Sequence, residues 1–188
     1  AFNGFAFAHL VDRQNRVWVG TSDKGVFCLD SRTGKELRHI TDSILSSNKQ
    51  EKIAQLNDSI FFFGHDLLNA YNSRSGENKI LSYSEGLISN DIHNMQVDLD
   101  GFLWIYTSKG ICRYNYFQNS FTQFGTRDGF GLLEADGYGG TLTAEGRIIF
   151  TGYTSVASFN PHQFNSSIKP DRPVLTTSST TTSVCRVA

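Results

Sequence analysis

The sequence lacks most of the features by which common functional classes are recognised. It holds only 3 Pro, 3 Cys and 1 Met in 188 residues, and its 17 Lys and Arg nearly balance its 18 Asp and Glu. Proteins held on nucleic acid by phosphate contacts usually carry a basic excess, so this balance argues against that class. The densest apolar run, residues 60–63, is far too short to cross a bilayer. The 15 Phe argue equally against disorder.

Motifs for metals and nucleophiles are also missing. Cys28, Cys112 and Cys185 lie far apart, and neither they nor the five histidines show the spacing of a zinc site. The segment 98–101 begins like a calcium loop but has no third acidic ligand or distal Glu, so an Asp-Gly hairpin turn explains it better. No Gly-x-Ser-x-Gly elbow or phosphate loop is present. We therefore expect no cofactor and no metal.

The N-terminal residues 1–5 show no basic segment and no cleavage pattern of a signal peptide. Two readings stay open at this point. The protein is cytoplasmic, or the chain is a mature or excised piece of a longer one.

An internal repeat organises the chain. Each copy reads as a strand end, an Asp or Asn turn, an apolar strand, a polar turn and a further strand. The copies lie at Val11–Val26, Leu56–His65, Val97–Ile111 and Leu142–Gly152. The first and third copies carry a Trp in the apolar strand, and the second is degenerate.

A second marker has the same period. An apolar residue followed by Asp or Asn recurs at separations of 42, 43 and 45 residues. The four pairs are Leu29-Asp30, Tyr71-Asn72, Tyr114-Asn115 and Phe159-Asn160. Two independent markers at one period make a chance repeat improbable.

Four short strands in about 43 residues are typical of a β-propeller blade. The sequence therefore predicts an all-β fold of about four four-stranded antiparallel blades. We place the blades at 1–45, 46–88 (degenerate), 89–131 and 132–168 (final), followed by a linker and disordered tail at 169–188.

These motifs resemble a known family. The pattern Asp-x-x-Gly/Asn-x-apolar-Trp, continuing to an aromatic or apolar residue before Asp or Asn, runs through Asp12–Asp30 and Asp98–Asn115. It resembles the two-component regulator propeller repeat of the periplasmic sensor region of Bacteroides-type hybrid two-component histidine kinases. The match is weaker over Asp58–Asn72, where Phe62 replaces the Trp. The segment Phe159–Pro161 resembles the family's final blade.

The resemblance, over residues 7 to about 176, implies a periplasmic, carbohydrate-responsive sensor module that is not itself an enzyme. Histidine kinase activity would lie elsewhere in the protein. The implied partners are an oligo- or monosaccharide, the remaining blades and an immunoglobulin-like domain, with no nucleic acid and no direct membrane insertion. Because family propellers close with seven blades, these four would be the C-terminal part of one, or a homodimer would complete the propeller.

Six repeat residues are expected to build the scaffold rather than to bind ligand. The two tryptophans should pack between neighbouring sheets, and the glycines should allow tight turns. The six residues are Asp12, Trp18, Gly25, Asp98, Trp104 and Gly110.

Ligand contacts are expected from the segments that precede the first strand of each blade, here called the lead-in segments. In a propeller they gather around one mouth of the central channel. They are residues 3–5, 48–50, 90–94 and 134–137. Because Asn, Asp and His side chains hold sugar hydroxyls, the candidate ligand residues are Asn90, Asp91, His93 and Asp136.

Two other functions stay open. A propeller enzyme of the lyase type would bring a His and a carboxylate together with a divalent metal at the channel. A structural half-domain would need the rest of its chain and would bind no small ligand.

Overall fold

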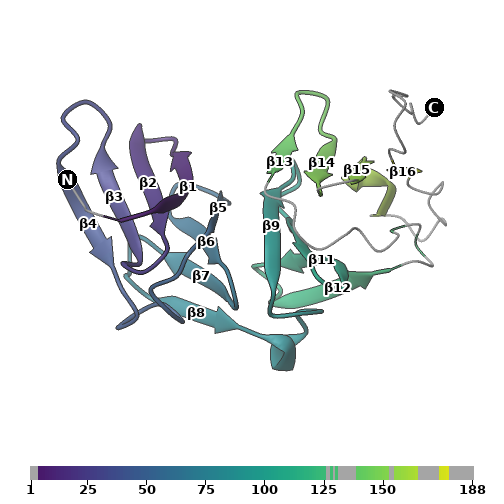
Figure 1. Ribbon diagram of the computed structural model, residues 1–188, viewed down its shortest axis with the longest axis horizontal. Helices are drawn as coiled ribbons and strands as arrows, with labels where there is room; N and C mark the ends of the chain where they lie inside the picture. Colours follow the sequence, from purple (N-terminus) through teal and green to yellow (C-terminus); the bar gives the residue numbers. More distant parts are fainter. Residues whose placement is uncertain are drawn as a thin grey trace. The chain divides into compact units, whose positions relative to one another are not determined.

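The computed structural model describes residues 4–125, 128, 130, 139–152, 155–164 and 174–177, which form mostly strands (Figure 1). They contain four four-stranded antiparallel sheets, and the strands of each sheet pair in chain order. A meander of this kind is a propeller blade, so the predicted fold class is confirmed. Among the residues described, no helix has the length and apolarity needed to cross a membrane.

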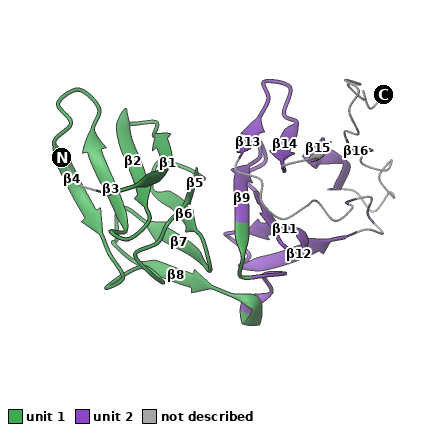
Figure 2. Ribbon diagram, viewed as in Figure 1, with its two compact units in different colours: residues 1–84, 90–92 green, residues 85–89, 93–188 purple. Residues whose placement is uncertain are grey.

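The chain divides into two compact units of two blades each (Figure 2). The first unit comprises residues 1–84 and 90–92. Its first blade contains β1 (Ala6–Val11), β2 (Arg16–Thr21), β3 (Val26–Asp30) and β4 (Glu36–Ile40). Its second blade contains β5 (Lys52–Gln55), β6 (Ile60–Gly64), β7 (Leu68–Asn72) and β8 (Asn78–Leu81), followed by a 3-10 turn, η1 (Tyr83–Glu85).

The second unit comprises residues 85–89 and 93–188. Its first blade contains β9 (Ile92–Val97), β10 (Leu103–Thr107), β11 (Gly110–Asn115) and β12 (Ser120–Phe124). Its second blade contains β13 (Gly139–Leu142), β14 (Ile148–Thr151), β15 (Ser155–Phe159) and β16 (Val174–Thr177), with the 3-10 helix η3 (Pro161–Phe164) before β16.

The outer strand of the last blade lies where the sequence predicted only a linker. Strand β16 pairs antiparallel with β15, from Ser155 opposite Thr177 to Ser158 opposite Val174. The predicted boundaries of 132–168 and 169–188 are therefore wrong at this point. The β-forming run Val174–Thr177 completes the sheet, but the repeat markers give no signal for a fourth strand after so long a connection. The remainder of the predicted tail lies outside the described residues.

Each unit has an aromatic core between its two blades. In the first unit, Trp18 is fully buried, with its ring centroid 4.3 Å from that of Phe61 and 6.0 Å from that of Phe63. In the second unit, the equally buried Trp104 lies 4.9 Å from Phe159. Flat, alternating apolar faces pack in this way when sheets stack. Both tryptophans therefore lie between sheets.

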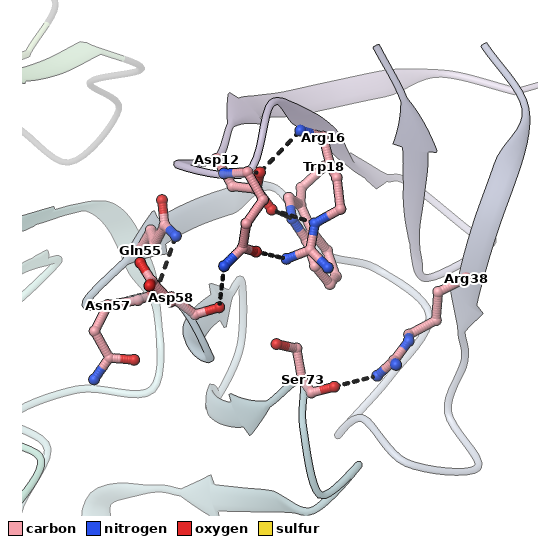
Figure 3. A network of polar contacts seen from close by, with 9 residues as sticks. Asp12, Arg16, Trp18, Arg38, Gln55, Asn57, Asp58 and Ser73 are labelled. Carbon is pink, nitrogen blue, oxygen red and sulfur yellow. Dashed lines mark hydrogen bonds and ion pairs between the residues drawn. The ribbon is translucent and has the colours of Figure 1, made fainter. Parts of the chain in front are cut away.

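A buried carboxylate ties each tryptophan to the turn before it. Asp12 Oδ1 accepts hydrogen bonds from the backbone N–H groups of Gln14 (2.9 Å) and Arg16 (2.8 Å), while Oδ2 accepts from Trp18 Nε1 (2.8 Å) and Arg16 Nε (2.7 Å). Figure 3 shows Asp12 between Arg16 and Trp18. Turn geometry and interblade packing are thus fixed by the same side chain.

The third blade repeats this arrangement. Asp98 accepts from the N–H groups of Asp100 (3.0 Å) and Phe102 (2.9 Å) and from Trp104 Nε1 (2.7 Å). Asp98 and Gly101, with its positive φ of 83°, therefore form a hairpin turn, as the sequence indicated for this segment.

Polar contacts also join the turns of the first two blades. Gln14 Nε2 donates to the Asp58 carbonyl at 3.3 Å, and Arg38 Nη1 donates to the Ser73 carbonyl at 2.9 Å (Figure 3). The same Arg38 nitrogen donates to the Tyr71 hydroxyl at 2.6 Å. These bonds lie at the edge of the aromatic core and link the first sheet to the second.

The second repeat marker is explained by side-chain capping of the turn after the third strand. Asp30 Oδ1 accepts from the N–H groups of Arg32 (3.1 Å) and Thr33 (2.8 Å), and Asn72 Oδ1 accepts from Arg74 N–H at 2.9 Å. Asp and Asn are favoured here because their short side chains mimic a backbone turn.

The degenerate second blade aligns differently from the sequence expectation. The backbone bond from Asp12 N to Arg16 O recurs from Leu56 N to Ile60 O, so Leu56 rather than Asp58 occupies the position of Asp12. Asp58 is exposed in the turn, while Asn57 Oδ1 caps it by accepting from Ile60 N–H at 3.0 Å. This blade keeps a capped turn without the bond between Asp and Trp.

The two described cysteines, Cys28 and Cys112, are free and buried. Burial raises the pKa of the Cys112 thiol to about 12. Both therefore remain neutral thiols that pack as small apolar side chains.

Gly25 and Gly34 allow a matched test of turn geometry. Both have positive φ (77° and 67°), but a Cβ at Gly25 would clash with the Ile40 carbonyl oxygen, whereas none of the atoms around Gly34 lies within 4 Å of its Cβ position. Gly34→Ala should cost about 1 kcal/mol of unfolding free energy from backbone strain alone. Gly25→Ala should cost about 3 kcal/mol or more. Denaturant unfolding measures both, and equal losses would contradict this packing.

Asp12 should contribute strongly to stability and to its pH dependence. Burial alone would raise the pKa of Asp12, but the hydrogen bonds from Arg16 and Trp18 outweigh burial and hold it below its usual value. Asp12→Ala should therefore cost about 2–4 kcal/mol near neutral pH, because Trp18 Nε1 loses its buried acceptor. The exposed Asp23→Ala should cost less than about 0.5 kcal/mol.

The pH dependence of this contribution has a definite sign. Because the folded pKa is depressed, the contribution is complete above the unfolded carboxyl pKa of about 4 and disappears as the pH falls through the lower folded pKa. The difference in unfolding free energy between the wild type and Asp12→Ala, followed by denaturant unfolding from neutral to acidic pH, should shrink over that interval. A difference that stays constant would refute the assignment.

Candidate functional site

The lead-in segments of the first unit meet at one turn. Gln50 N–H donates to the Thr21 carbonyl at 2.9 Å, Gly25 N–H donates to the Asn48 carbonyl at 2.7 Å, and Ser22 N–H donates to the Phe5 carbonyl at 3.1 Å. Both segments therefore lie beside the turn from β2 to β3. This is the end of the blades opposite the Asp12 turn, because β1 and β2 run in opposite directions.

A charged cluster occupies this end of the second blade. Glu51 lies 3.3 Å from Lys49 Nζ, 3.4 Å from His65 Nδ1 and 4.0 Å from Lys52 Nζ. His65 Nε2 is 3.2 Å from an Asp66 carboxylate oxygen. We call these five residues the Glu51 cluster. It arises where β5 begins and where β6 turns into β7, two points joined by the Glu51 N–H bond to the Gly64 carbonyl (3.0 Å).

The cluster is only partly open to solvent. The side chains of Glu51, Lys52 and His65 are 13%, 12% and 18% exposed. Burial lowers the pKa of Lys52, and Glu51 partly offsets that effect. Lys49 and Asp66 are more open, with side chains 44% and 73% exposed. Because ion pairs are screened less where water is partly excluded, Glu51, Lys52 and His65 form the better-ordered part of the cluster.

A buried amide network holds the adjoining lead-in segment. Asn69 Oδ1 accepts from Ser46 N–H at 2.8 Å, and Gln50 Nε2 donates to the Ser47 carbonyl at 2.9 Å. Asn69 Nδ2 in turn lies 3.3 Å from Gln50 Oε1. Both amide side chains are fully buried. The segment leading to Lys49 and Glu51 is therefore preorganised by the sheet behind it.

The four sequence-predicted ligand residues have different surroundings. Asn90 is exposed, and its Oδ1 accepts the Tyr83 N–H at 2.8 Å, as a turn cap does. Asp91 is also exposed, and the next residue, Ile92, donates its N–H to the His65 carbonyl at 2.8 Å. Asp91 therefore adjoins the Glu51 cluster.

His93 belongs to the second unit, and Asp136 is not among the described residues. The His93 ring is half-buried and lies 5.5 Å from the Tyr106 ring. The prediction that these four residues bind ligand thus stays a prediction, with Asn90 and Asp91 on the same unit as the Glu51 cluster.

Sequence reasoning passed over Glu51, Lys52 and His65 as site residues. The signal was the charged run Lys49–Lys52 directly before an inner strand, together with His65-Asp66 in place of the Gly turn found in the first blade. These two stretches come together only through strand register, because Lys52 on β5 pairs with Gly64 on β6.

The donor geometry of His65 does not favour a metal. Its two ring nitrogens face different carboxylates, so the three groups do not converge on one point. Within the described part of the chain, no group of three or more His, Cys, Asp or Glu could hold a metal ion.

Solved structures share this fold. The extracellular domain of the hybrid two-component system BT3049 from B. thetaiotaomicron superposes with a TM-score of 0.68 at 22% identity, covering 82% of this chain and 21% of that one. The extracellular domain of BT4673 from the same organism gives 0.73 at 14%, covering 94% and 25%. The chain folds as propeller blades of this kind. It spans only about a fifth to a quarter of these domains.

A third similar structure is an enzyme. A catalytically inactive virginiamycin B lyase from Staphylococcus aureus, solved with quinupristin, gives a TM-score of 0.67 at 12% identity, covering 94% of this chain and 56% of that one. No family model and no curated protein matches the sequence. The resemblance seen in the repeats is thus confirmed at the level of the fold.

Proposed function

We propose that this chain is part of a periplasmic, ligand-sensing propeller of a hybrid two-component sensor, and that its ligand is a saccharide. The observation that carries the proposal is the preorganised Glu51 cluster at the lead-in end of the blades. The shared fold with extracellular domains of two-component systems supports a sensing role. The chain itself performs no catalysis in this proposal, and histidine kinase activity resides elsewhere in the protein.

The chemistry of the cluster suits sugar hydroxyls. Each hydroxyl both donates and accepts hydrogen bonds, so a carboxylate oxygen and a cationic N–H group side by side can satisfy it. Glu51 and Asp66 supply acceptors, and Lys49 and Lys52 supply donors, within a few ångströms. Partial burial of Glu51 and Lys52 strengthens the charge-assisted bonds that they form. Asn90 and Asp91 would add neutral and acidic contacts from the neighbouring lead-in segment.

The proposed partners follow from the same role. The remaining blades of the propeller and an immunoglobulin-like domain would carry the ligand-induced change toward the kinase. A homodimer is the alternative way to complete the propeller.

Calorimetric titration with a panel of neutral and acidic oligosaccharides tests the ligand proposal, on this chain and on the natural polypeptide that contains it. We expect at least one saccharide to bind, and Glu51→Gln and His65→Ala each to weaken binding about tenfold, as loss of a charged hydrogen bond does. Arg74→Ala, in the exposed turn at the opposite end of the blade, should change affinity less than about twofold.

Either of two results would overturn it: no saccharide binds the natural polypeptide, or Arg74→Ala weakens binding as much as the cluster variants. Failure of all ligands would favour the structural half-domain.

A second function has one observation in its favour, the structural similarity to virginiamycin B lyase. His65 and Glu51, 3.4 Å apart, would be the acid–base pair of such an enzyme. Incubation with quinupristin followed by mass spectrometry tests it directly. Turnover that His65→Ala abolishes would establish an enzyme, and unchanged substrate would remove this alternative.

A further inference from the structure

The first blade has two apolar faces, and strand register separates them. Val17 lies opposite Val11 on β1 and Leu29 on β3, while Val19 lies opposite Phe27. Directly opposed residues point to the same side of a sheet, so these five form one surface, the Val17 face. Trp18 alternates with Val17 and Val19 and therefore points to the other side, where it contacts the second blade.

In the second blade, the residues that correspond to Val17 and Leu29 pack against Trp18 of the first blade. There Phe61 lies opposite Tyr71, as Val17 lies opposite Leu29. Phe61 and Tyr71 are fully buried in the cluster around Trp18.

The second unit repeats this arrangement. Ile148 lies opposite Phe159 in the last blade, and both are fully buried in the cluster around Trp104. The same pair of positions thus accepts the tryptophan of the preceding blade twice in this chain.

In the first blade these positions are apolar but incompletely covered. Val17 and Leu29 are half-buried, and Val11 is 60% exposed. Leu37, at the bulge of β4, is 51% exposed. Val19 and Phe27 are buried, and the ring of His39 stacks on Phe27 with centroids 4.0 Å apart. The incompletely covered part of the face is therefore the part around Val11, Val17 and Leu29.

We propose that the Val17 face binds a further propeller blade of the same polypeptide, one that presents a large aromatic side chain on its second strand. This interface rests on the part of the proposed function that places the chain in a larger propeller, and it is independent of the ligand. The similar extracellular domains are four to five times longer than the stretch that this chain matches. A blade in the same chain also acts at high effective concentration.

A second copy of this chain is a poorer occupant. Among the described residues, the large aromatic side chains at this position of a second strand are Trp18, Phe62 and Trp104, and all three are fully buried. A copy would have to expose one of these buried side chains to supply the aromatic ring.

Thiol labelling tests the interface. Val17→Cys, a conservative change, is treated with a maleimide in the 188-residue chain and in the natural polypeptide, with the unsubstituted proteins as background. We expect labelling in the short chain and labelling at least about tenfold slower in the natural polypeptide, because thiol reactivity follows exposure. Ile80→Cys, at an exposed side chain on β8, should differ by less than about twofold.

Three results would overturn the proposal. Val17→Cys could label equally fast in both proteins, or the natural reading frame could encode no blade before this one. Labelling of the short chain could also be slow and concentration-dependent, which would make a second copy the occupant. Val11→Cys, at a more exposed position, gives the same readout should Val17→Cys not fold. Saccharide titration does not enter this test, so the interface and the ligand proposal fail separately.

Discussion

The hydrogen bond from an indole N–H to a buried carboxylate is the interaction on which this fold depends. Asp12 and Asp98 each sit in a turn at the end of an inner strand and accept from a tryptophan six residues later, at 2.8 and 2.7 Å. A buried carboxylate is costly unless several donors surround it. The turn N–H groups and the indole together satisfy it. One side chain therefore shapes the hairpin and orients the ring that fills the space between blades.

The carboxylate–indole bonds lie at one end of the blades, so the opposite, lead-in end can carry other chemistry. In the first blade the lead-in end is also structural, because Thr21 Oγ1 bonds the Gly25 carbonyl at 2.8 Å and closes the turn. The second blade has neither the Asp–Trp pair nor this Thr-Gly turn. His65 and Asp66 stand in its place and pair with Glu51. The charged cluster thus lies in a blade that lacks both structural features of the first blade.

The sequence allowed the architecture to be predicted because its markers are local. The carboxylates of Asp12 and Asp30 each cap backbone N–H groups of the next few residues, so the period of these turns is visible without any tertiary information. The Glu51 cluster is different, since Glu51 and His65 meet only through the pairing of β5 with β6. Leu56 likewise replaces Asp12 in a turn that looked centred on Asp58, which only the backbone bonds reveal. Strand β16 joins its sheet after a connection that carries no marker.

The surroundings of the two indoles also exclude a role for them in sugar binding. The Arg16 guanidinium lies 5.5 Å from the Trp18 ring centroid, and Arg113 lies 5.6 Å from that of Trp104. The two cations come from different strands, β2 and β11, yet each indole has a carboxylate at its N–H edge and a cation over its face. This matches the charge distribution of an aromatic ring, whose face is negative and edge positive. With edge and face both engaged and no surface exposed, neither tryptophan can stack on a sugar. The saccharide recognition that we propose therefore does not use these two rings and rests on the polar side chains of the Glu51 cluster.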